Sequence, residues 1–306
     1  GIPLAVGNDA KLMLGRTPGN IRAVRPLRDG VIADFDAAEQ MLKTFIQKCN
    51  EGRGIIAPRL VVGIPSGVTG VERRAVREAG LAGAREVHLI DEPVAAAIGA
   101  SLPVTEPIGT MIVDIGGGTT EVAVLSLGGT VLSESVRVAG DEINDSIATY
   151  LKKVHNLVVG ERTAEEIKIK IGSAFPSNEF DLQSIDVRGL HLLSGLPRSI
   201  NLKAGDLREA MSEPLNKIVD AVKRTLERTP PELAADIVDR GIMLAGGGAL
   251  VRGISDLLSH ETGIFTHVAE DPLLCVVNGC GLVLDDFKSM RRVLDTPDFA
   301  RNVIRD

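Results

Sequence analysis

Apolar and polar positions along the chain predict a succession of short strands and helices. Residues 33–50 place their apolar side chains on one helical face, so we predict an amphipathic helix there. Asp36 and Glu39 resemble a capping box at its start. The continuous apolar run at 60–65 then predicts a strand that is buried on both faces.

The next segment continues this alternation of strand and helix. Thr69 and Glu72 have the spacing of a capping box, which predicts a helix directly after the strand. A short apolar run at 87–90 predicts a second strand, and Pro93 suits the first turn of an alanine-rich helix behind it. Together these elements form a β-α-β-α unit.

A second β-α-β-α pattern occurs near the end of the chain. We predict a strand at 241–245, a glycine turn at 246–248, a helix at 249–260, a strand at 265–268 and a helix that begins at Asp271-Pro272. In the first unit, Glu92-Pro93 likewise opens the last helix. The repeat favours a duplicated α/β domain, with chance similarity as the alternative.

The segment between the two units has a different pattern. Strands are predicted at 111–115 and 122–125, joined by a glycine-rich turn, and Gly128-Gly129 predicts a hairpin into a third strand at 131–138. A helix from Glu142, a second helix and a strand-like stretch follow. We interpret this part as a smaller lobe inserted into the second unit.

The start of that second helix has its own sequence pattern. Residues 163–173 form the predicted helix, with Thr163 and Glu166 as its capping pair. The strand-like stretch behind it covers residues 180–202.

Composition narrows the possible functions. A length of 306 residues favours two compact units, and a net charge of -7 with a pI near 5.4 argues against a nucleic-acid partner. No apolar run is long enough to cross a bilayer, which favours the cytoplasm. The three cysteines, Cys49, Cys275 and Cys280, have no CxxC spacing, and we expect buried free thiols.

Three consecutive glycines follow the strand that ends near Asp114. Gly116, Gly117 and Gly118, with Thr119 behind them, would let backbone N–H groups approach phosphate oxygens closely. Asp114 is placed to hold a hydrated Mg²⁺, which prefers carboxylate oxygen. The alternative is a plain glycine hairpin with a surface aspartate.

A second glycine turn lies between a predicted strand and helix. Ala245, Gly246, Gly247, Gly248 and Ala249 could bring a ligand against the backbone at a helix start, although a purely structural turn has the same pattern.

Other residues offer weaker indications of chemistry. Glu92 could orient or deprotonate a water molecule that attacks a phosphate, or it could only favour the helix dipole. Ile55 and Ile56 form a short apolar loop, which suits core packing or a contact with a membrane or partner. The five histidines show no metal-binding or triad spacing.

These features together resemble the superfamily of actin, sugar kinases and Hsp70, and three segments are similar to the MreB family. The segments are MLGRTPGN at 13–20, RPLRDGVIADF at 25–35 and DEPVAAAIG at 91–99. The resemblance covers essentially the whole chain. It implies an α/β fold of duplicated actin-like (ribonuclease H-like) domains around a nucleotide cleft.

The resemblance also implies domain boundaries. Residues 1–26 would be part of a small lobe of the first domain, and 27–106, completed by 276–306, the first actin-like domain. Residues 107–142 and 206–275 would form the second domain, with 143–205 as its inserted small lobe. Family members begin with a strand and a first phosphate loop, so we expect the first domain to lack its N-terminal strands.

The implied function is that of an ATP-binding protein that polymerises into membrane-associated filaments and organises wall synthesis and rod shape. ATP or ADP with Mg²⁺ would bind Asp114, the turn 116–119 and the turn 245–249, with Glu165 and Lys168 flanking the adenosine. Glu92, assisted by Thr119, would position the hydrolytic water in a weak ATPase.

The implied partners are further copies of the chain, the inner face of the cell membrane and membrane proteins of wall synthesis. Ile55 and Ile56 match the lipid-touching loop of the family. A small-molecule kinase on the same scaffold and a non-hydrolysing nucleotide-binding protein remain alternatives.

Overall fold

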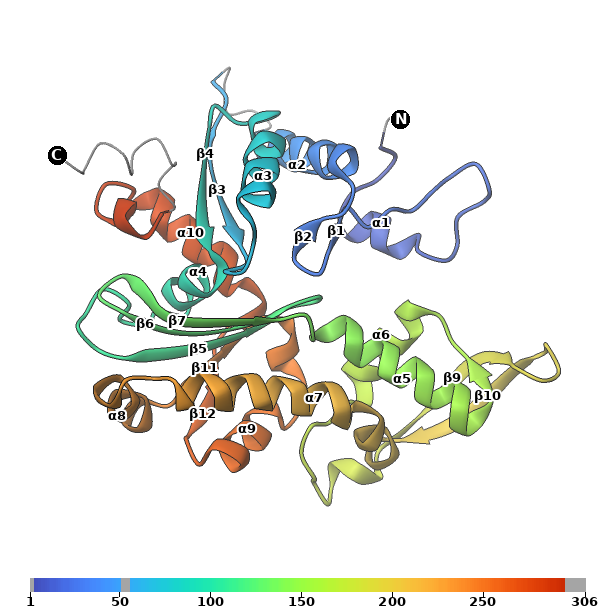
Figure 1. Ribbon diagram of the computed structural model, residues 1–306. Helices are drawn as coiled ribbons and strands as arrows, with labels where there is room; N and C mark the ends of the chain where they lie inside the picture. The colour runs from blue at the N-terminus through green and yellow to red at the C-terminus, as the bar shows by residue number, and fades with distance from the viewer. Residues whose placement is uncertain (1–2, 51–55, 295–306) are drawn as a thin grey trace.

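Two lobes make up the molecule. The computed structural model describes residues 3–50 and 56–294. In Figure 1 the N-terminal elements form the upper lobe, drawn in blue and cyan, and the elements after residue 110 form most of the lower lobe. The last long helix, drawn in red, runs back to the upper lobe. The chain therefore crosses between the lobes more than once.

The upper lobe is built around a small parallel pair of strands. Its elements are α1 (Asn8–Leu12), β1 (Leu27–Arg28), β2 (Val31–Ile32), α2 (Phe35–Asn50), β3 (Arg59–Ile64), α3 (Gly70–Leu81), β4 (Glu86–Asp91) and α4 (Glu92–Gly99). Strand β3 pairs with β4 in parallel, from Arg59 opposite Glu86 to Ile64 opposite Asp91. The local core under this pair contains Ile46, Ile64, Ala84, Val87 and Leu89.

Local capping explains where the helices of the upper lobe begin. The predicted capping box of α3 is confirmed, because Thr69 and Glu72 exchange both hydrogen bonds. The predicted cap of α2 is wrong, because that helix begins at Phe35 and Asp36 lies inside its first turn. Asp34 caps it instead, since its Oδ1 accepts a hydrogen bond from Ala37 N at 3.1 Å.

A five-stranded sheet forms the centre of the lower lobe. Its strands are β5 (Thr110–Ile115), β6 (Thr120–Ser126), β7 (Gly129–Val136), β11 (Ile242–Ala245) and β12 (Thr266–Val268), in the order β12-β11-β5-β6-β7. Strand β11 is parallel to β5 and β12, whereas β6 and β7 are antiparallel. The hairpin between β6 and β7 turns at Leu127 and Gly128, which both have positive φ, so Gly129 already belongs to the strand.

The two faces of this sheet support different parts of the molecule. On β5, Met111, Val113 and Ile115 belong to the large core of the lower lobe. Ile112 belongs instead to the core that includes the apolar faces of α4 and α10 (Cys275–Asp285). Because side chains alternate along a strand, Asp114 shares the face of Ile112 and points toward α4.

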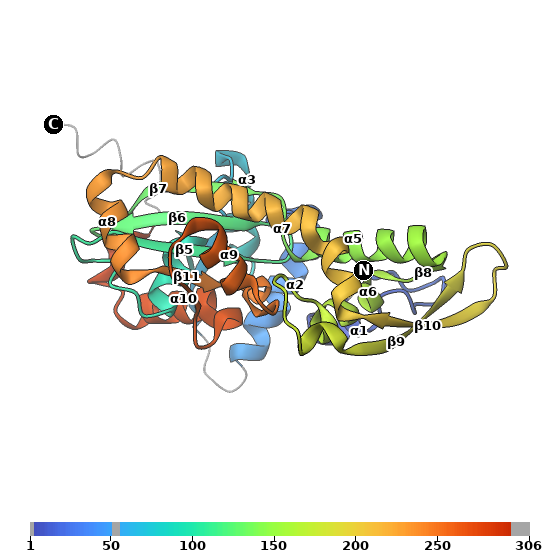
Figure 2. The same cartoon turned by 90° about the horizontal axis from the view of Figure 1, so that it is seen from below.

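The segment 140–203, which includes most of the predicted inserted lobe, contains a three-stranded sheet and helices. Its elements are α5 (Gly140–His155), β8 (Leu157–Val158), α6 (Glu161–Ile171), η1 (Phe180–Leu182), β9 (Ser184–His191) and β10 (Pro197–Lys203), followed by α7 (Ala204–Glu227) and α8 (Pro231–Arg240). Helix α7 lies along one face of the five-stranded sheet in Figure 2. The strand order is β10-β9-β8.

Two helix predictions in the lower lobe are corrected. Helix α6 begins at Glu161, two residues before the predicted start, so Thr163 and Glu166 lie within the helix and do not cap it. The helix predicted at 249–260 consists of a 3-10 turn, η2 (Gly247–Leu250), and a separate helix α9 (Ile254–Thr262). Gly253, in a left-handed conformation, separates the two pieces.

The last helices of the two β-α-β-α units cross each other closely. In the second unit, η3 (Pro272–Leu274) opens α10, and η4 (Met290–Val293) follows it. A Cβ atom on Gly99 of α4 would overlap the carbonyl oxygen of Cys275, and one on Gly279 would overlap that of Ala95. The glycines therefore allow backbone contact between α4 and α10, as expected for paired halves of a duplicated fold.

Candidate functional site

The two glycine turns lie side by side at one edge of the large sheet. Ala245, at the end of β11, is opposite Asp114 near the end of β5, and the two strands are parallel. Ligands of open α/β sheets bind outside such carboxyl ends. A Cβ atom on Gly246 would overlap both Asp114 Oδ1 and the carbonyl oxygen of Ile115, so the close approach of the two turns requires glycine.

The turn between β5 and β6, here called the phosphate turn (residues 116–119), presents free backbone donors. Gly116 N donates to Thr119 O at 2.9 Å and closes the turn. Among the described residues, the N–H groups of Gly117 and Gly118 have no acceptor. Two adjacent unpaired N–H groups fit the oxygens of a phosphate group.

The phosphate turn is tied from behind to helix α5. Gly140 N donates to Gly116 O at 3.1 Å, and Asp141 N donates to Gly117 O at 2.8 Å. Lys168 Nζ on α6 donates to the carbonyl oxygen of Gly140 at 2.9 Å. Burial lowers the pKa of Lys168, opposed by nearby acidic groups. Lys168, which is predicted to flank the adenosine, therefore supports the phosphate turn through Gly140.

Three carboxyl groups lie close enough to interact electrostatically near the end of the sheet, those of Glu92, Asp114 and Glu121. Burial, and secondarily the charges of Asp114 and Glu121, raise the pKa of Glu92 to about 8. Burial and then the charge of Glu121 raise the pKa of Asp114 to about 7. Asp114 is 6% exposed and, among the described residues, has no hydrogen-bond or ion-pair partner. A nearby cation would stabilise its ionised form.

Glu121 is a site residue that the sequence reasoning missed. It lies on β6 opposite Asp114 and is fully buried. Its carboxylate accepts hydrogen bonds from Ser66 N at 3.2 Å and from Ser135 Oγ at 2.5 Å, so it joins the loop after β3 to the large sheet. Burial raises its pKa and the two serines oppose that shift. A single carboxylate within the apolar run of β6 could have indicated this role.

The turn between β1 and β2 covers the phosphate turn from the upper lobe. A Cβ atom on Gly30 would lie 2.7 Å from Pro65 Cγ and 3.2 Å from Thr119 Cγ2. One on Gly118 would lie 2.9 Å from the Cα atom of Asp29. Thr119 is buried in this junction.

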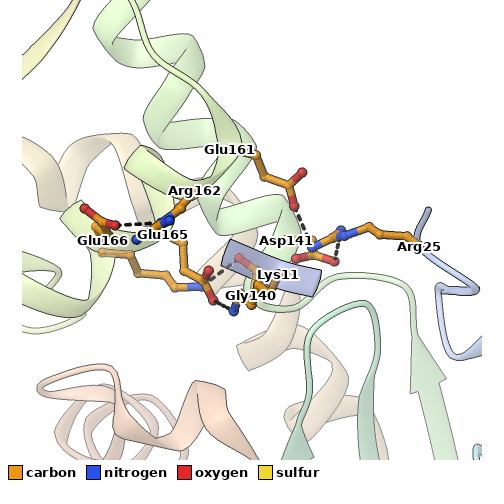
Figure 3. A network of polar contacts seen from close by, with 9 residues as sticks. Lys11, Arg25, Gly140, Asp141, Glu161, Arg162, Glu165 and Glu166 are labelled. Atoms are coloured by element: carbon orange, nitrogen blue, oxygen red, sulfur yellow. Dashed lines mark hydrogen bonds and ion pairs between the residues drawn. The ribbon is translucent and has the colours of Figure 1, made fainter. Parts of the chain in front are cut away.

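Basic residues of the N-terminal segment meet acidic residues of α5 and α6 in Figure 3. Lys11 Nζ lies 2.8 Å from Glu165 Oε1. Arg25 lies 3.1 Å from Asp141 Oδ2 and 2.5 Å from Glu161 Oε1. Glu165, predicted to flank adenosine, is thus paired with Lys11. Pairs between residues more than 100 positions apart leave no local pattern, so the sequence reasoning did not find Lys11, Arg25 or Asp141.

The remaining sequence predictions have mixed outcomes. Ile56 is 76% exposed, so it does not pack in the core, and Ile55 lies outside the described residues. Cys275 and Cys280 are buried free thiols as expected, whereas Cys49 is exposed on the last turn of α2, so that prediction is wrong. None of the helices described is both long and apolar enough to cross a membrane.

Comparison with protein families identifies the chain. The model of the MreB/Mbl protein family matches residues 2–292. The chain belongs to the MreB/Mbl family. It is 55% identical over 283 residues to the cell shape-determining protein MreB of Escherichia coli (strain K12), covering 92% of this chain and 81% of that protein. It is 48% identical over 288 residues to the cell shape-determining protein Mbl of Bacillus subtilis (strain 168), covering 94% and 86%.

Solved structures agree with this placement in the MreB/Mbl family. The crystal structure of MreB5 of Spiroplasma citri bound to ADP superposes with a TM-score of 0.88 at 37% identity, covering 94% of this chain and 86% of that one. The MamK double helical filament has a TM-score of 0.75 at 20% identity, covering 91% and 84%, which shows the shared fold alone. The predicted actin-like fold is thereby confirmed. The family match and the cell shape-determining relatives confirm the predicted cytoskeletal role in cell shape.

Proposed function

We propose that this member of the MreB/Mbl family binds ATP or ADP with Mg²⁺ between its lobes and uses the nucleotide to assemble filaments. The observation that carries this proposal is the pair of adjacent glycine turns beside the carboxylate of Asp114, which has no partner in the described part of the chain. MreB5 of Spiroplasma citri has been crystallised with ADP and with AMPPNP, at 37% and 36% identity to this chain.

The described residues fit such a ligand. The free N–H groups of Gly117 and Gly118 suit phosphate oxygens, and turn 245–249 would lie against the adenosine. Glu165 and Lys168 of α6 would flank the adenosine from the other side. A Mg²⁺ ion held through water by Asp114 would neutralise phosphate charge. With a positive charge nearby, Asp114 would remain ionised at neutral pH.

Glu92 is the proposed catalytic base, assisted by Thr119. It begins α4 and interacts electrostatically with Asp114, and its pKa of about 8 is near the pH at which a general base is effective. Its role would be to orient a water molecule and accept its proton. The protein would then be a weak ATPase. The alternative is a protein that binds the nucleotide without hydrolysing it.

We propose that the assembled filaments lie in the cytoplasm at the inner face of the cell membrane. The relatives at 55% and 48% identity are named as cell shape-determining proteins. The exposed side chain of Ile56 suits a contact with lipid or with membrane proteins of wall synthesis. The domain boundaries implied by the sequence, with residues 143–205 as an inserted lobe, belong to the same proposal.

Light scattering and pelleting with Mg-ATP, with and without lipid vesicles, test this function. Cooperative assembly that depends on nucleotide supports it, and Asp114→Ala should weaken Mg-nucleotide binding and assembly together. Absence of pelleting and of filaments under both conditions would reject it. Turnover of a small acceptor without assembly would favour a kinase instead.

A further inference from the structure

Negative charge surrounds the phosphate turn on its outer side as well as on its buried side. Asp141 is part of the first turn of α5, and its backbone N–H donates to Gly117 O at 2.8 Å. A Cβ atom on Gly117 would lie 3.9 Å from Asp141 Oδ2, so this carboxylate stands directly beside the turn. Glu161 lies in the first turn of α6. Both carboxylates would repel an incoming polyphosphate.

A single guanidinium group from the other lobe contacts both carboxylates. Arg25 Nη1 donates to Asp141 Oδ2 at 3.1 Å, and Nη2 lies 2.5 Å from Glu161 Oε1. Figure 3 shows Arg25 reaching both acids from the segment before β1. The planar fork of arginine can engage two acceptors at once, which a lysine cannot do with the same geometry.

The network offers a natural comparison for Arg25. Arg162, on α6, donates to Glu166 Oε1 at 3.0 Å and to Leu12 O at 3.5 Å. It too joins α6 to the N-terminal segment, but within the described part of the chain its guanidinium forms no ion pair with Asp141 or Glu161. Loss of Arg162 therefore removes a similar contact between α6 and the N-terminal segment and leaves the ion pairs of Asp141 and Glu161 with Arg25 in place.

We propose that Arg25 is a positioning residue of the phosphate site, which neutralises Asp141 and Glu161 from the opposite lobe and so permits a polyphosphate to bind the turn. This inference rests on the proposed function. Its effect on affinity depends on the charge of the ligand, so it is larger for a triphosphate than for a monophosphate.

The test compares the affinities of the full chain for Mg-ATP, Mg-ADP and AMP by calorimetry. Arg25→Ala should weaken ATP binding by about tenfold or more, ADP less, and AMP by about twofold or less, because the uncompensated carboxylates act on phosphate charge. Arg25→Lys should recover part of the loss, since the charge remains without the fork. Arg162→Ala is the matched control and should leave the three affinities in their original ratio.

A double variant tests whether the loss of affinity comes from the charge of Asp141. Adding Asp141→Asn to Arg25→Ala should restore ATP affinity to within about threefold of the unsubstituted protein, because the repelling charge is removed. Equal weakening for all three nucleotides, or no recovery in the double variant, would overturn the inference while the proposed function stands. Failure of the unsubstituted protein to bind ATP at all would reject both.

Discussion

The carboxylates on the two sides of the phosphate turn differ in burial and in pairing. On the buried side, Asp114 and Glu92 have no ion-pair partner among the described residues and carry raised pKa values of about 7 and about 8. On the outer side, Asp141, Glu161 and Glu165 are partly exposed and each is paired with a cation of the N-terminal segment.

This difference suggests that the two groups of carboxylates have different roles in a polyphosphate site. Buried carboxylates without partners are unstable as anions, so they favour a cation that arrives with the ligand. Exposed carboxylates with partners are already compensated by the protein itself, so they need no cation from the ligand.

Glu92→Gln removes the proposed base from the buried side. We expect the rate of ATP hydrolysis to fall by about 10²-fold or more, as is typical for loss of a general base, while Mg-ATP affinity changes by less than about threefold. Single-turnover phosphate release measures the rate. Glu78→Gln, on the exposed part of α3, is the control. Hydrolysis at the original rate in Glu92→Gln would remove Glu92 from the catalytic role.

Asp114→Asn should change how stability depends on pH. The pKa of Asp114 is raised from 3.8 to about 7 in the folded protein, so the folded state binds this proton more tightly than the unfolded state. Stability of the nucleotide-free protein therefore falls as pH rises from about 4 to 7, by up to about 4 kcal/mol from this group. Asp114→Asn should flatten that decline.

Urea unfolding at pH 5.5 and 8 measures this difference. The unsubstituted protein should have the lower free energy of unfolding at pH 8, and the gap should be smaller in the variant. An equal gap in both proteins would show that the carboxyl group of Asp114 does not titrate in this window.

Gly246→Ala tests how tightly the buried side is packed. A Cβ atom there would overlap Asp114 Oδ1 and the backbone of Ile115, and the residue has a φ of 79°. We expect a loss of about 3 kcal/mol in the free energy of unfolding from strain and overlap together. Gly263→Ala is the control, because Gly263 has a φ of 71° and no atom lies within 4 Å of the added Cβ. This variant has backbone strain without overlap, so its free energy of unfolding should fall by about 1 kcal/mol. Equal losses would contradict the close approach.

Lys11→Met tests the paired side, where the effect should be smallest. The side chains of Lys11 and Glu165 are 52% and 27% exposed, so the pair should contribute less than about 1 kcal/mol to stability. The contribution should largely vanish in 1 M salt, where screening acts over about 3 Å. Thermal unfolding compares it with Lys217→Met, whose partner Glu213 lies on the same helix. A large loss that persists in salt would mean that this side is not solvent-screened.

Local patterns made much of the fold predictable. The capping box of Thr69 and Glu72 and the proline that opens α4 depend on neighbouring residues, and both are confirmed. The start of α6 was misplaced, because Thr163 and Glu166 have the spacing of a capping box although the helix begins earlier, after Gly160. The spacing of two polar residues alone does not show at which residue a helix begins.

The candidate site divides in the same way. Both glycine turns and Asp114 are predictable from the sequence, because a run of glycines directly after an apolar strand is typical of a turn that approaches a ligand closely. It did not indicate that Arg25 meets Asp141, since these residues are separated by 116 positions and meet only through the packing of the two lobes. Glu121 is intermediate, because strand alternation places it on the face of Asp114 but does not reveal its bonds to Ser66 and Ser135.

Helix α5 runs from the phosphate turn to the three-stranded sheet, where it packs against β8. Its first two residues, Gly140 and Asp141, are hydrogen-bonded to the turn, and its 16 residues form a rod about 24 Å long at 1.5 Å per residue. A rotation of about 3° at the turn therefore displaces the opposite end of this rod by about 1 Å. A small rotation of the phosphate turn would therefore become a larger displacement at His155, where α5 ends.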